Sequence, residues 1–120
     1  MDNLLMVGRV LVGAYFILSG IKHFTGLAGM TGYAKSKGMM MPRESVIITG
    51  LMMLVGGLGV LLWVRVEMSL WLLIAFLVLS SFLMHRYWSV SEPMARMGEE
   101  INFKKNLALA GALLMVLAMM

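Results

Sequence analysis

The sequence predicts an all-α integral membrane protein: an antiparallel bundle of four transmembrane helices, with a short interfacial helix between the first two. Hydrophobic residues make up 61% of the 120 residues and charged residues 13%, whereas soluble domains have about 45–50% and about 25%. Four apolar runs fill most of the chain, separated by short basic or polar connectors. A run of about 18 or more mostly apolar residues can cross a bilayer core as a helix.

The four runs define the expected spans of a single domain that covers residues 1–120. We place them at about residues 4–21, 46–64, 68–84 and 103–120. The second span has 19 residues, from Val46 to Val64, without a charged residue. Only 14 residues follow Asn106, which is short for a span. We therefore begin the fourth span at residue 103, with Lys104 and Lys105 extending toward the lipid headgroups.

The connector between the first two spans is too apolar for a plain loop. Pro42 follows it at a position typical of a first helical turn, and Glu44 lies near the positive end of the helix dipole. Four apolar residues of the connector recur at helical spacing, opposite Lys35 and Lys37: Leu27, Met30, Tyr33 and Ala34. This pattern predicts a short interfacial helix that ends at Gly38. By contrast, we expect residues 89–102, which hold most of the acidic charge, to be solvated.

The distribution of basic residues predicts the orientation. The connectors at residues 22–45 and 85–106 carry most of the lysines and arginines, while Arg9 and Arg65 lie toward the other side. With four spans, these connectors share one side of the membrane. The positive-inside rule therefore predicts a multi-pass protein of the bacterial inner membrane with both termini outside the cytoplasm.

Composition also excludes several kinds of chemistry. The chain has no cysteine, which excludes disulfides, thiolate metal sites and cysteine-held iron–sulfur clusters. The net charge of +4 is spread among the connectors rather than along one face. We therefore expect membrane lipids, and not nucleic acid, as a partner.

Polar residues at the ends of the spans form the candidate binding site. If the helices form a closed bundle, these residues converge on one face and could bind a quinone carbonyl or a small oxyanion. The alternative is that basic and aromatic residues, including Tyr87 and Trp88, simply mark the headgroup region. The candidate residues are Lys22, His85, Arg86, Lys105 and Asn106.

Three other features have structural and functional interpretations. His23 and His85, with 15 methionines, could suggest a metal, but no histidine or methionine motif supports one, and we predict no metal site and no catalytic residue. Arg9 lies inside the first span and needs either the interface or a partner such as Glu67. Glycines at 13 and 20, and at 50 and 57, are spaced to share helix faces, as are Ala108 and Ala112.

The chain resembles the DoxX family of small four-helix bacterial membrane proteins over almost its whole length. The resemblance rests on the order of several short motifs: residues 8–13 (GRVLVG) with Phe16 and residues 19–22 (SGIK), residues 33–38 (YAKSKG) with Pro42, Gly56-Gly57, residues 85–88 (HRYW), and residues 105–111 (KNLALAG). Many relatives carry a glutamate three residues before the paired glycines, where this chain has Met53. A proton-handling role at that position is therefore not expected here.

The resemblance implies a complex-forming or quinone-adjacent role, since the family name comes from a subunit of a thiosulfate:quinone oxidoreductase. The leading hypothesis is a non-catalytic subunit that docks or stabilises a membrane redox or other enzyme complex, next to a partner subunit or a second copy. The absence of a cofactor motif or a buried acid favours it. Bulky changes at lipid-facing small residues, such as Gly57→Leu, would then be damaging. The alternative is a quinone-binding component of an oxidoreductase, with quinone as its cofactor. A transporter is less favoured, because no discontinuous helix or inverted repeat is evident.

Overall fold

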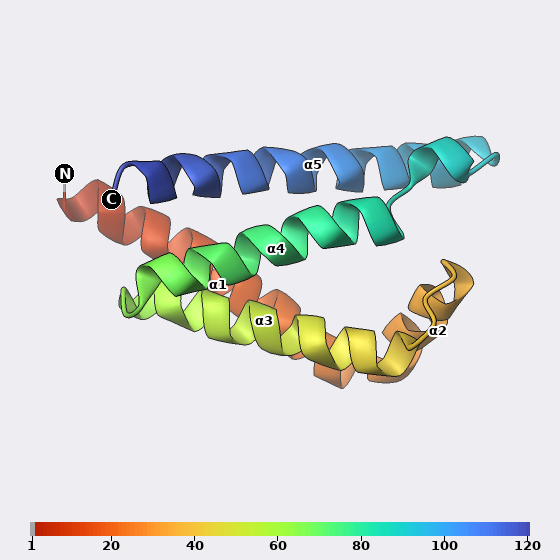
Figure 1. Ribbon diagram of the computed structural model, residues 1–120, viewed down its shortest axis with the longest axis horizontal. Helices are drawn as coiled ribbons and strands as arrows, with labels where there is room; N and C mark the ends of the chain where they lie inside the picture. Colours follow the sequence, from red (N-terminus) through yellow and green to blue (C-terminus); the bar gives the residue numbers. More distant parts are fainter. Residues whose placement is uncertain (1) are drawn as a thin grey trace. The chain divides into compact units, whose positions relative to one another are not determined.

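The computed structural model describes residues 2–120, which fold into helices (Figure 1). These are α1 (Asp2–Thr25), α2 (Leu27–Ser36), α3 (Pro42–Leu62), α4 (Val66–Met84), the 3-10 helix η1 (Tyr87–Ser89) and α5 (Pro93–Ala118). Four of the helices, α1, α3, α4 and α5, are long and apolar enough to cross a membrane. The predicted all-α fold, with four long apolar helices and a short helix between the first two, is confirmed.

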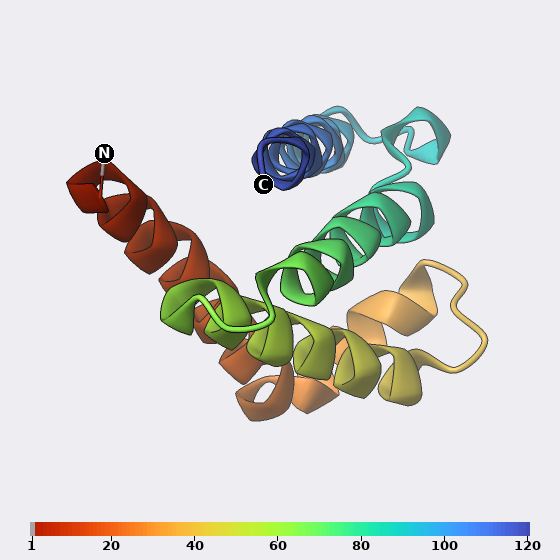
Figure 2. The same ribbon diagram turned by 60° about the vertical axis from the view of Figure 1, so that its left-hand side comes forward.

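The chain divides into two compact units, and the boundary between them falls within α4. The first unit ends at Leu73, and the second covers Ile74–Met120. In the first unit α1 packs along α3, and α2 contacts both helices. Figure 2 shows α2 and the loop after it beside the N-terminal half of α3.

Glycines bring α1 and α3 into close contact at two levels. A Cβ atom at Gly13 would lie 3.0 Å from the carbonyl oxygen of Gly57, and one at Gly20 would lie 3.0 Å from that of Gly50. The earlier glycine of α1 meets the later glycine of α3, so the helices run antiparallel. The sequence interpretation of these four glycines as packing residues is confirmed.

The short helix predicted between the first two spans is present as α2 (Leu27–Ser36). It ends at Ser36, and the following Gly38 has a φ of +87°, a conformation that glycine adopts without the steric cost of a Cβ atom. Pro42 then occupies the first turn of α3, together with Glu44, as the sequence predicts.

The turn between α3 and α4 has the predicted length of three residues but lies two residues earlier, at residues 63–65. α3 ends at Leu62 rather than at residue 64, because Trp63 takes a left-handed conformation with a φ of 58°. The backbone N–H of Val64 donates to the carbonyl of Gly59, which satisfies one of the carbonyls left without a partner at the helix end. Arg65 is also left-handed, with a φ of 49°.

In the second unit, α5 begins well before the predicted fourth span. Pro93 lies in its first turn, and the side chain of Glu92 accepts hydrogen bonds from the backbone N–H groups of Met94 and Ala95, at 3.2 and 2.7 Å. A capping carboxylate followed by a proline is a typical sequence signal for the start of a helix. The prediction that residues 89–102 are solvated is wrong at Glu99, which is only 8% exposed.

Aromatic side chains connect α4, η1 and α5 within the second unit. The Phe103 ring of α5 makes edge contacts with Phe82, Tyr87 and Trp88, at centroid distances of 5.2, 5.6 and 5.3 Å. Edge-to-face pairs at such distances are favourable beyond the area they bury. Tyr87 and Trp88, expected as membrane-interface residues, thus also belong to a packed aromatic cluster.

Candidate functional site

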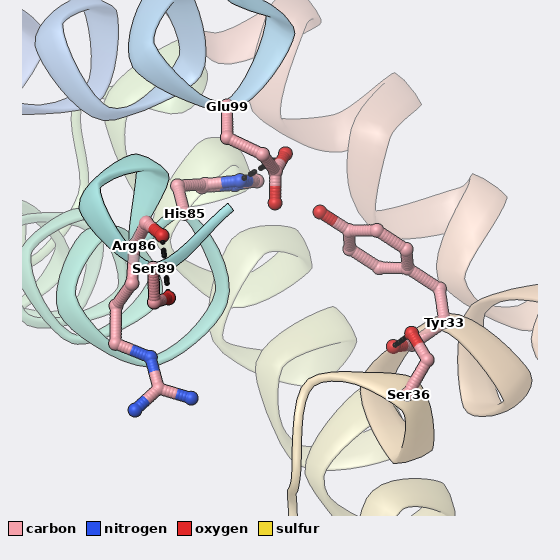
Figure 3. Close-up of polar contacts among 6 residues, drawn as sticks. All are labelled: Tyr33, Ser36, His85, Arg86, Ser89 and Glu99. Atoms are coloured by element: carbon pink, nitrogen blue, oxygen red, sulfur yellow. Dashed lines mark hydrogen bonds and ion pairs between the residues drawn. The ribbon is translucent and has the colours of Figure 1, made fainter. Parts of the chain in front are cut away.

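The candidate site is built around a histidine–carboxylate pair in the second unit (Figure 3). His85 lies just after α4, and its Nδ1 is 3.2 Å from Oε1 of Glu99 on α5. The two side chains are only 15% and 10% exposed. A buried carboxylate that accepts a hydrogen bond from a histidine ring can fix the tautomer and the orientation of that ring.

Glu99 is the residue that sequence reasoning missed. The sequence predicts no buried acid, and this prediction is wrong at Glu99, which is buried and contacts His85. A signal was available in the Glu92-Pro93 pair, which marks the true start of the helix. Once α5 extends to Pro93, Glu99 falls on the same face as Asn106, Ala110 and Leu113, which are all buried.

Asn106 contributes the second buried polar group. It is 6% exposed and lies on α5 about two turns after Glu99, on the same face. An amide has both donor and acceptor atoms, so a buried amide on the same helix face as Glu99 is suited to a polar ligand.

The remaining predicted site residues are distributed over both units. Arg86 and Lys105 lie in the second unit and are exposed, one beside His85 and the other beside Asn106 in the chain. The backbone carbonyl of Arg86 accepts a hydrogen bond from the hydroxyl of Ser89 at 2.9 Å (Figure 3). Lys22 is also exposed but belongs to the first unit, near the end of α1.

Ser81 is not available as a nucleophile at this site. The Ser81 hydroxyl is fully buried and donates to the carbonyl of Leu77 at 2.8 Å, as expected of a serine that bonds back to its own helix. The second unit thus offers a histidine held by a carboxylate and a buried amide, with Arg86 and Lys105 as their neighbours in the chain. Together these groups can bind a polar headgroup with both donors and acceptors.

His23 has a separate role in the first unit. Its Nδ1 lies 3.0 Å from the carbonyl oxygen of Val46 and 3.2 Å from the hydroxyl of Thr49. A carbonyl only accepts, so Nδ1 carries the hydrogen. Among residues 2–120 no group of three or more potential metal-ligating side chains is found.

Arg9 is bound by α3 rather than by Glu67. Its Nη2 and Nε donate to the carbonyl oxygen of Leu61, at 2.9 and 3.3 Å, and its guanidinium lies 5.6 Å from the ring centre of Trp63. No ion pair between Arg9 and Glu67 is present in the described part of the chain. The arginine therefore has a structural partner at the end of α3.

Gly57 also differs from its predicted environment. A Cβ atom there would lie 3.0 Å from both Cγ1 and the backbone nitrogen of Ile17, and 3.1 Å from the carbonyl oxygen of Gly13. Gly57 is therefore an internal contact between α1 and α3. The prediction that Gly57 faces lipid is therefore wrong.

Comparisons with known proteins agree with this description. The model of the DoxX family matches residues 4–86. The chain is 29% identical, over 113 residues, to the inner membrane protein YphA of Escherichia coli (strain K12), a match that covers 94% of this chain and 80% of the relative. No solved structure matches the chain. The relative and the four candidate spans identify a multi-pass inner membrane protein.

Proposed function

The chain belongs to the DoxX family, and from that premise we propose that it is a small subunit of an inner-membrane enzyme complex that holds a quinone headgroup. The observation that carries the proposal is the buried contact between His85 and Glu99, with the buried amide of Asn106 on the same face of α5 as Glu99. A quinone carbonyl is an acceptor that the Asn106 amide could satisfy.

The fit to a quinone headgroup rests on the kinds of groups present. Asn106 supplies a neutral donor, and Arg86 and Lys105, which follow His85 and precede Asn106 in the chain, supply cationic donors in the same unit. The aromatic cluster of Phe82, Tyr87, Trp88 and Phe103 supplies flat apolar surfaces next to them. A mostly apolar site with a few placed polar groups is typical of cofactor binding. A bound quinone would supply two-electron redox chemistry, and this chain would bind and orient the headgroup.

The subunit part of the proposal follows from where the polar groups lie. His85 and Arg86 lie just after α4, and Glu99, Lys105 and Asn106 lie in α5 between its second turn and its middle, while the spans are dominated by apolar side chains and close glycine contacts. Such a chain fits a role in holding a quinone for a partner enzyme better than a role as a complete oxidoreductase. We propose a protein partner in the same membrane, with lipids around the complex.

Native mass spectrometry of the complex in nanodiscs tests both parts. We expect a heteromeric mass with a quinone-sized adduct that is lost in Asn106→Leu and reduced in Lys105→Ala. Lys104→Ala is the matched control, because it removes a neighbouring positive charge whose contact is an exposed ion pair with Glu100. A wild-type protein with neither partner nor adduct would refute the proposal.

A further inference from the structure

The contact between His85 and Glu99 determines which ring nitrogen a ligand can use. Oε1 of Glu99 lies 3.2 Å from Nδ1, and an ionised carboxylate accepts hydrogen bonds but donates none. Nδ1 therefore carries the ring hydrogen, and in the neutral ring Nε2 is an acceptor. Within the second unit no described group donates to Nε2.

The other candidate polar groups of the second unit are mainly hydrogen-bond donors. Arg86 and Lys105 have only donor hydrogens, and the amide of Asn106 has both a donor and an acceptor. A site made of donors alone would bind any carbonyl or anion without regard to its redox state. Nε2 of His85 is the feature that can distinguish a ligand with a hydroxyl from one without.

We propose that Nε2 of His85, fixed as an acceptor by Glu99, accepts a hydrogen bond from a hydroxyl of a hydroquinone, so that the site binds the reduced form of a quinone more tightly than the oxidised form. This inference rests on the proposed quinone site. A quinone presents carbonyl oxygens that only accept, whereas a hydroquinone presents hydroxyls that also donate. The oxidised form leaves Nε2 without a hydrogen-bond partner, and such an unmade bond weakens binding.

Binding measurements on the full-length protein in nanodiscs test the inference, with decylubiquinol and decylubiquinone as probes. We expect the reduced probe to bind about tenfold more tightly, the effect of about one net hydrogen bond. His85→Phe should remove the preference and keep the aromatic packing. Glu99→Gln should reduce the preference for the reduced probe. The glutamine amide can donate a hydrogen bond to Nδ1, which allows the tautomer with its hydrogen on Nε2.

A direct measurement of the tautomer guards against variants that fail to fold. Nitrogen-15 NMR of the histidine-labelled wild-type protein should show His85 with a protonated Nδ1 and an unprotonated Nε2. A hydrogen on Nε2, equal affinity for the two probes, or a preference that survives in His85→Phe would overturn the inference while leaving the quinone site intact. Binding of neither probe would overturn the quinone site as well.

Discussion

The guanidinium of Arg9, in the second turn of the chain's first helix, donates to the carbonyl oxygen of Leu61 at 2.9 Å. Leu61 lies in the last turn of α3, where backbone carbonyls have no partner within the helix. A cation at this end also opposes the negative end of the helix dipole. The arginine in the first span is thus a side-chain cap that joins α1 to the end of α3.

Replacing Arg9 tests this cap. We expect Arg9→Met to lower the free energy of unfolding by about 1–3 kcal/mol, because the Leu61 carbonyl loses a charged donor in a place poor in water. Arg9→Lys should be intermediate, since it keeps the charge but not the planar guanidinium. Thermal unfolding in detergent measures the difference. Arg43→Met is the control, and an equal loss there would argue against the cap.

The crossing of α1 and α3 predicts a strong dependence on residue size at Gly57. Gly57→Ala should destabilise the protein by about 1–3 kcal/mol, because the new methyl group would meet the backbone of Ile17 and Gly13. Gly111→Ala is the matched control, since no atom of its own unit lies within 4 Å of a Cβ there. Denaturant or thermal unfolding in nanodiscs checks both variants, and similar effects of the two would contradict the crossing.

Alanine substitutions at two glycines, one within α2 and one just after it, should change the stability of the protein in opposite directions. Gly38→Ala should destabilise the protein by about 1 kcal/mol, because its φ of +87° is strained for a residue with a Cβ atom. Gly32→Ala lies inside α2 with nothing within 4 Å, and it should gain up to about 1 kcal/mol in helix propensity. Hydrogen exchange of α2 amides measures the two effects, and a shift in the same direction for both would contradict the assigned backbone.

The bond from His23 to Val46 predicts an asymmetric response to amide substitutions. The amide of asparagine can take the place of Nδ1, whereas that of glutamine corresponds better to Nε2. We therefore expect His23→Asn to keep most of the stability and His23→Gln to lose about 1 kcal/mol, the net value of one hydrogen bond. The unfolding midpoints of the two variants in the same detergent give the comparison. A more stable glutamine variant would reverse the assignment of Nδ1 as the donor.

The amino-acid sequence by itself determined the class of the protein. Long apolar runs fix a helical membrane protein, since backbone groups in hydrocarbon must be satisfied within the helix. The same local rules placed α2, the start of α3 at Pro42 and the packing role of Gly13, Gly20, Gly50 and Gly57. Each of these features depends on neighbours in the chain or on a simple helical period.

Only the tertiary structure decided the partners of the polar side chains. Arg9 binds Leu61 rather than Glu67, and Gly57 faces α1 rather than lipid. Glu99 is buried against His85, although it lies in the most acidic stretch of the chain. These outcomes depend on residues that are distant in sequence and on how far α5 extends, because the direction in which a charged residue faces is set by the helix that packs beside it.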